Sequence, residues 1–159
     1  MEVTIRPLAS VADEAAFRAL NEEWISTHFE LEEEDRRQLA DPTAAYVDPG
    51  GEILVVELDG EVVGCVAIAP DGTGAFELSK MAVTPEMRGR GLGRRLLESA
   101  IARARELRGT SLFLGSSTRL PSAVHLYETL GFEHVPRESL HMPYARASVF
   151  MRLELPPEA

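Results

Sequence analysis

The chain contains 159 residues, of which 45% are hydrophobic, and carries a formal net charge of -10 at pH 7. This length suffices for one hydrophobic core, so we expect a single domain spanning residues 1–159. The acidic charge excludes nonspecific binding to nucleic acid, which depends on clustered Lys and Arg, and the short apolar runs exclude a membrane span of roughly twenty residues.

The first residues indicate the cellular compartment, and the cysteines and histidines restrict which disulfide, nucleophile or metal chemistry the chain can support. The N-terminus lacks the basic-then-apolar layout of a signal peptide, so a cytoplasmic protein is expected. Cys65 is the only cysteine, which excludes an internal disulfide, and its apolar neighbours predict a buried side chain rather than a nucleophile. The histidines, at positions 28, 125, 134 and 141, lack the spacing of a metal site, so no metal is expected.

In chain order, the N-terminal half predicts a strand, two helices and a β-hairpin. Residues 3–7 form the strand, and Ser10 is the expected N-cap of a helix that runs to Phe29. Residues 31–40 form a second helix, and the acid run Glu30–Asp35 at its start is expected to be solvated. Two β-rich runs flank Asp59-Gly60 and predict a hairpin.

The C-terminal half alternates strands with helices. A turn at 71–74 precedes a strand over 75–83, and the apolar spacing that follows predicts an amphipathic helix from Leu92 to Leu107, stopped by Gly109. The remaining expected elements are a strand at 111–114, a helix at 121–130 and strands at 132–135 and 149–155. The order predicts a mixed α/β domain with the strands in the middle and helices on both faces.

The most informative segment is the Gly- and Arg-rich turn from Arg88 to Arg95, between a strand and a helix. Its glycines allow consecutive backbone N–H groups to face one concavity, and the helix dipole adds positive potential, so the turn suits a pyrophosphate. The glycine spacing matches neither the dinucleotide fingerprint nor a P-loop. The alternative interpretation is a flexible loop with solvated charges.

At these residues the chain resembles the GNAT superfamily of N-acetyltransferases. The family motif of Arg or Gln, two residues, Gly, one residue, and Gly or Ala is matched by Arg88, Gly91 and Gly93. Residues 77–83 resemble the strand before this motif, and residues 126–132 resemble the helix-to-strand signature of the family. One departure is Leu120, which stands where many relatives carry an Asn that contacts the pantetheine arm.

The resemblance implies a fold and a cosubstrate. The expected fold is α/β, with a central, mostly antiparallel sheet that splays between its fourth and fifth strands to admit acetyl-CoA. No metal is implied. The residues implied to bind the cosubstrate are Met81, Ala82, Val83, Arg88, Gly89, Arg90, Gly91, Leu92, Gly93, Arg94 and Ser117. The contact made by the Asn of relatives is either missing here or supplied by Ser116, Ser117 or Thr118.

Two residues are implied to act in catalysis. An amine must lose a proton to attack a thioester, and Glu77 matches the general base, acting through a water, while Tyr127 matches the general acid that serves the departing thiolate. Each has an alternative. Glu77 could be a structural charge, with Lys80 on the opposite face of a regular strand, although a β-bulge would change those faces. Tyr127 could be a core aromatic in a helical row with its apolar neighbours.

The acceptor is the least constrained part of the prediction. In relatives the first two helices and a late loop cover the acceptor pocket, which makes His28, Glu30, Tyr144 and Arg146 candidate substrate-binding residues. A small-molecule amine or a peptide amine would suit an acidic protein. A noncatalytic acyl-CoA-binding module and a protein N-acetyltransferase acting on a partner are the alternative functions, and a homodimer is left open.

Overall fold

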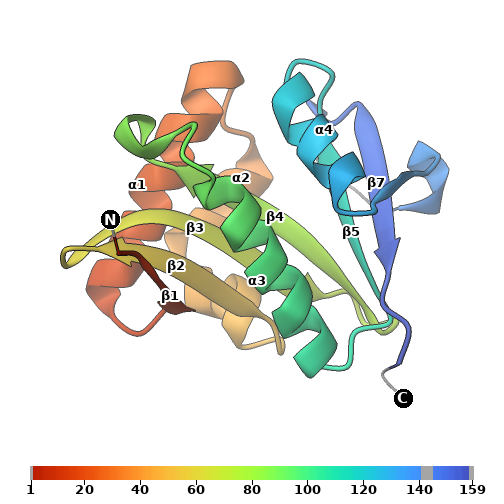
Figure 1. Ribbon diagram of the computed structural model, residues 1–159, viewed down its shortest axis with the longest axis horizontal. Coiled ribbons are helices and arrows are strands. Elements are labelled where there is room, and N and C mark those ends of the chain that lie inside the picture. The colour runs from red at the N-terminus through yellow and green to blue at the C-terminus, as the bar shows by residue number, and fades with distance from the viewer. Residues whose placement is uncertain (1, 141–144, 158–159) are drawn as a thin grey trace.

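The computed structural model describes residues 2–140 and 145–157, which form a mixed α/β fold around a single sheet. The strands are β1 (Thr4–Pro7), β2 (Glu52–Leu58), β3 (Glu61–Pro70), β4 (Ala75–Val83), β5 (Ser111–Ser116), β6 (Glu133–His134) and β7 (Val149–Glu154). Within the described residues they lie in the order β1-β2-β3-β4-β5-β7-β6 (Figure 1). All neighbours are antiparallel except β4 and β5, which are parallel, so the predicted mostly antiparallel sheet is confirmed.

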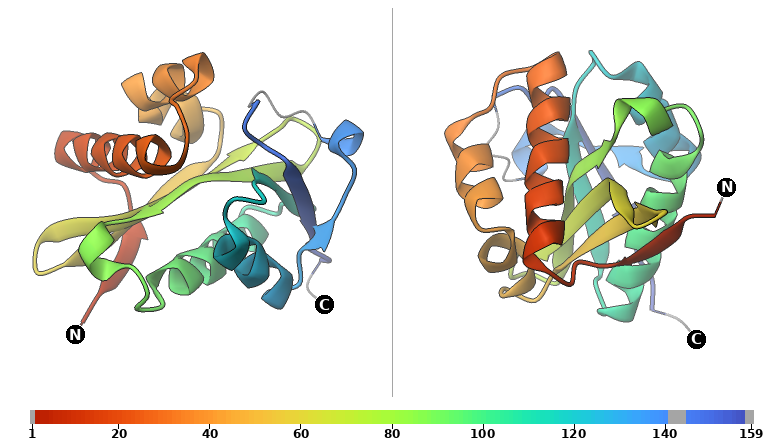
Figure 2. Two further views of the ribbon diagram at one scale, coloured as in Figure 1. Left: turned by 90° about the horizontal axis from the view of Figure 1, so that it is seen from above. Right: turned by 90° about the vertical axis from the view of Figure 1, so that its left-hand side faces the viewer.

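Helices cover both faces of the sheet, as the sequence predicted (Figure 2). They are α1 (Val11–His28), α2 (Glu33–Ala40), α3 (Leu92–Glu106) and α4 (Pro121–Thr129). The first two lie on one face and the last two on the other. Ser10 caps α1 by accepting a hydrogen bond from the Asp13 backbone N–H, and Gly131 follows α4 with a φ of 100°, as expected for a helix stop. The sequence did not predict the short π-helix at Thr43–Val47.

Each face of the sheet has its own hydrophobic core. The core under α3 and α4 includes Leu96, Leu97 and Met151, which are fully buried. The core under α1 and α2 includes Phe17 and Cys65, so the prediction of a buried cysteine is confirmed. No described helix combines the length and the apolar character that crossing a membrane requires.

The parallel strands β4 and β5 pair only at their beginnings. The register runs from Ala75 opposite Ser111 to Glu77 opposite Phe113, and beyond Glu77 the two strands have no further partners in each other. Figure 1 shows them diverging from this point. The edge of β4 that faces β5 is therefore left open in the described chain, and the predicted splay between the fourth and fifth strands is confirmed.

A β-bulge in β4 corrects one expectation. Ser79 pairs with Ala67 and Ala82 with Cys65, so two residues of β4, Lys80 and Met81, lie opposite one residue of β3. Lys80 has a φ of 57°, a value that non-glycine residues seldom adopt. Because an extra residue reverses the alternation of side chains, Lys80 does not lie on the opposite face from Glu77. Both side chains line the same pocket.

Candidate active site

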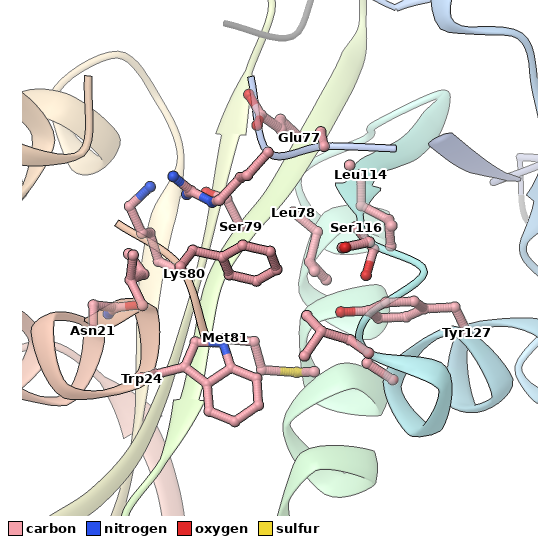
Figure 3. Close-up of a pocket in the computed structure, with 18 residues that line it drawn as sticks. Asn21, Trp24, Glu77, Leu78, Ser79, Lys80, Met81, Leu114, Ser116 and Tyr127 are labelled. Atoms are coloured by element: carbon pink, nitrogen blue, oxygen red, sulfur yellow. The ribbon is translucent and has the colours of Figure 1, made fainter. Parts of the chain in front are cut away.

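A pocket with a volume of about 140 Å³ lies where β4 and β5 diverge (Figure 3). Strand β4 supplies one wall, the end of β5 and helix α4 supply the second, and α1, which packs on β4, closes a third side. The lining residues include Asn21, Trp24, Phe29, Glu77, Ser79, Lys80, Met81, Leu114, Ser116, Ser117, Leu120, Tyr127 and Arg146. The walls combine apolar side chains with several polar and charged ones, so the pocket can both hold and orient a small molecule.

Glu77 lies in this pocket at the last paired position of β4 before the splay. Burial raises the pKa of its carboxyl to about 7, an effect that the nearby charge of Lys80 partly opposes. A carboxyl group with a pKa near neutrality can accept and release a proton at physiological pH. The position and environment of Glu77 therefore suit a general base.

Tyr127 contributes both to the core and to the pocket. The residue is 7% exposed, and its ring packs edge-on against Phe132 at 5.8 Å between centroids. Figure 3 shows the ring extending from α4 with its hydroxyl directed into the pocket. Burial raises the pKa of the Tyr127 hydroxyl to about 12, so the hydroxyl keeps its proton at neutral pH and can donate it to an anion.

The Gly-rich turn forms a cradle at the start of α3. Gly89 and Gly91 have φ angles of 79° and 81°, and a side chain added at either glycine would enter open space. Gly91 is the N-cap of α3, whose first N–H groups have no carbonyl partners within the helix. Open space, exposed amides and the positive end of a helix dipole together fit a pyrophosphate group.

The side chain of Arg88 does not point into this cradle. Its Nη2 atom donates to Glu23 Oε2 at 2.6 Å, its Nε atom donates to the Val83 carbonyl at 3.0 Å, and its guanidinium lies 4.9 Å from the centre of the Trp24 ring. Because Trp24 lines the pocket, Arg88 connects the glycine turn to a wall of that pocket.

A buried ion cluster that the sequence did not predict lies beside Glu77. Asp35, from the first turn of α2, is fully buried and contacts Lys80 at 2.9 Å and Arg146 at 2.6 Å. The expectation that the whole acid run at the start of α2 is solvated is therefore wrong for Asp35. The Lys80 ammonium and the Arg146 guanidinium take the place of water around its carboxylate. The one lysine of the chain, placed in the strand that also carries Glu77, was the sequence signal of this cluster.

The structure places the remaining residues predicted for the pocket and the acceptor site differently. Met81, Ser117 and Arg146 line the pocket, and Ser117 Oγ accepts a hydrogen bond from the Arg119 backbone N–H at 3.1 Å. His28, the last residue of α1, and Glu30, just after the helix, do not line the pocket. Tyr144 lies outside the described residues. Ala82 and Val83 lie further along β4, and the pocket lining ends at Met81.

Comparison with known proteins gives consistent matches. Residues 14–132 match the model of the acetyltransferase (GNAT) family. An uncharacterised N-acetyltransferase of Escherichia coli, YjgM, is 37% identical over 119 residues, covering 70% of this chain and 71% of the relative.

Two solved structures are similar over nearly all of their length. A putative acetyltransferase from Salmonella typhimurium, determined with its cofactor acetyl-CoA, has a TM-score of 0.75 and 27% identity over 100% of this chain and 97% of its own. A GNAT-family acetyltransferase from Staphylococcus aureus has a TM-score of 0.89 over 98% and 100% of the two chains, and its 18% identity supports the fold alone.

Proposed function

The chain belongs to the acetyltransferase (GNAT) family and is an acetyl-CoA-dependent acyltransferase, and on that premise we propose that it transfers the acetyl group to a primary amine of a small molecule or peptide. The whole chain, residues 1–159, would act as one domain. The observation that carries this proposal is that one pocket contains both Glu77, whose pKa is about 7, and the Tyr127 hydroxyl, which is protonated at neutral pH.

The proposed reaction is direct transfer without a covalent enzyme intermediate. The amine nitrogen attacks the thioester carbonyl carbon, a C–N bond forms and the C–S bond breaks. The proton lost by the nitrogen passes to Glu77, directly or through a water, and the Tyr127 hydroxyl donates a hydrogen bond or its proton to the departing sulfur. Glu77 and Tyr127 come from β4 and α4, so the two proton-transfer groups approach the splay from different elements.

The proposed acetyl-CoA site follows the open edge of β4 and the glycine turn. Backbone groups from Met81 to Val83 would pair with the pantetheine amides, and the amides of the turn from Arg88 to Arg94 would hold the pyrophosphate. Ser117, which lines the pocket at the end of β5, would supply the contact for which relatives use an Asn. The Arg88 side chain contributes through Trp24 rather than by contacting phosphate.

A pair of glycine variants tests acetyl-CoA binding. Acetyl-CoA should raise the melting temperature of the wild-type protein, because it binds the folded state. Gly91→Leu should lose most of this shift, since its side chain would enter the cradle. Gly60→Leu is the matched control, because Gly60 has a φ of 82°, also faces open space and lies in the β2–β3 turn. Equal acetyl-CoA shifts in the two folded variants would reject this site.

The acceptor is tested by steady-state turnover against a panel of amines and peptides. Free primary amines or peptide amines should consume acetyl-CoA and release CoA with an acetylated product identified by mass spectrometry. Acetyl-CoA binding without turnover on any member would instead favour the noncatalytic module. A strong preference for one peptide sequence over free amines would favour a protein N-acetyltransferase.

A further inference from the structure

Asp35 makes more contacts than its place at a helix start requires. Its Oδ1 accepts hydrogen bonds from Lys80 Nζ at 2.9 Å and Arg146 Nη2 at 2.8 Å. Its Oδ2 accepts from Arg146 Nη1 at 2.6 Å and from the Glu32 backbone N–H at 2.9 Å. The carboxylate thus joins α2, the bulge of β4 and the segment before β7.

Stability alone does not account for this cluster. The Lys80 and Asp35 side chains are 2% and 0% exposed, and replacing such a buried ion pair by apolar side chains is often neutral or stabilising. The chain also places its only lysine at a φ of 57°, where a non-glycine residue is strained. An arrangement that combines strain with buried charge next to a pocket points to a role in the site.

The bulge that carries Lys80 is held from the side of α1 as well. The Cys65 thiol donates to the Lys80 carbonyl at 3.5 Å, and Asn21 Nδ2 donates to Cys65 Sγ at 3.4 Å. Asn21 is fully buried and also donates to the Phe17 carbonyl of its own helix at 2.9 Å. The backbone of Lys80 is therefore fixed by Asn21 and Cys65, and its ammonium is fixed by Asp35.

We propose that Lys80 is a positioning residue for the transfer reaction: anchored by Asp35 on the β4 bulge, its ammonium favours the ionised form of the Glu77 carboxyl, the form that can receive the amine proton. This inference rests on the proposed role of Glu77. Without the bulge the two side chains would lie on opposite faces of β4. With it, both line one pocket.

Other charged groups around Glu77 act in both directions. Glu34 of α2 and Asp71 of the β3–β4 turn are like charges and favour the protonated form of Glu77. Arg146 lines the same pocket, where Asp35 and Glu32 bind its guanidinium. Lys80 is the group whose positive charge opposes the effect of burial on the pKa of Glu77. Removing Lys80 should therefore move this pKa upward, and removing Glu34 should move it downward.

The test is a carboxyl ¹³C NMR titration of Glu77, whose resonance is identified by its absence in Glu77→Gln. The midpoint should move to higher pH in Lys80→Met and to lower pH in Glu34→Gln. Lys80→Gln provides a second neutral variant, whose amide can still donate to Asp35, in case Lys80→Met does not fold. Folding is verified for each variant by the acetyl-CoA thermal shift.

A kinetic readout uses one primary amine found active in the panel. The ratio of variant to wild-type kcat/KM removes the titration of the amine itself, which is common to both proteins. For the neutral Lys80 variant this ratio should approach its maximum at alkaline pH and fall by roughly tenfold toward pH 6. A fall of this size is expected if the pKa of Glu77 rises by about one, because the ionised fraction below both pKa values then drops about tenfold. For Glu34→Gln the ratio should rise toward acid pH.

An unmoved Glu77 midpoint in a folded neutral Lys80 variant would overturn the proposal. A kcat/KM ratio lowered equally at every pH would also overturn it, because a merely structural lysine gives that result. Failure of the proposed base is a separate observation. In that case Glu77→Gln would retain wild-type turnover, while the NMR midpoint would still report whether Lys80 controls the ionisation of Glu77.

Discussion

Replacing Glu77 by Gln removes the proposed proton acceptor while conserving the shape of the side chain. Because the pKa of Glu77 is about 7, the ionised fraction should rise from about one tenth at pH 6 to about nine tenths at pH 8. Loss of a general base costs roughly 10²- to 10⁴-fold in rate. We therefore expect a loss of that order at pH 8 and a loss about tenfold smaller at pH 6.

The assay is kcat/KM between pH 6 and 9 at saturating acetyl-CoA, expressed as the ratio of wild type to variant. Glu61→Gln, which alters an exposed carboxylate at the start of β3, should match the wild type throughout. Stability separates the two interpretations of Glu77. The pKa of Glu77 is raised on folding, so above pH 7 its charged form destabilises the folded state. Glu77→Gln should therefore have a melting temperature no lower than that of the wild type at pH 8. A less stable variant with an unchanged pH–rate profile would refute the reasoning and leave Glu77 as a structural charge.

Three further outcomes are expected. Tyr127→Phe should lower turnover by roughly ten- to a thousandfold with little change in acetyl-CoA affinity or melting temperature, because the ring stays packed on Phe132; a loss of stability with normal turnover would indicate a core aromatic only. Arg88→Ala should raise KM for the acceptor more than it weakens acetyl-CoA binding, because the Arg88 side chain holds Trp24. Acceptor kinetics and acetyl-CoA titration measure the two effects, and Arg94→Ala, which alters an exposed side chain, serves as the comparison. A larger effect on acetyl-CoA binding than on the acceptor KM would return the Arg88 side chain to the phosphate site. Burial raises the pKa of Asp35, but hydrogen bonds from Arg146 and the charge of Lys80 outweigh this effect and lower the pKa to about 2. Stability on the order of 2 kcal/mol, present above pH 4, should therefore disappear between about pH 4 and pH 2 when denaturant unfolding of the wild type is compared with that of Asp35→Asn. Glu77 acts in the opposite sense between pH 7 and 4.5, and an equal loss of stability in acid for both proteins would contradict this origin.

The sequence by itself determined the order of elements and the position of the Gly- and Arg-rich turn. Caps and stops such as Ser10 and Gly131 are local signals, because the backbone geometry they favour depends on the residue itself and its immediate neighbours. The motif of Arg88, Gly91 and Gly93 is equally local, and the structure has left-handed glycines at the start of α3 where the motif predicted a cradle. The turn at residues 71–74 also marked the start of the strand predicted over 75–83, which are the bounds of β4 in the structure.

Only the tertiary structure decided which side chains meet at the site. The bulge at Lys80 depends on pairing with β3 and on Cys65 and Asn21, so a count of alternating residues assigned Lys80 to the wrong face of β4. Asp35 resembled a solvated residue in an acidic helix start, because the cations that bury it lie 45 and 111 positions away in the chain. Contacts at such separations are set by how the helices and the sheet pack, which one strand or helix pattern cannot encode on its own.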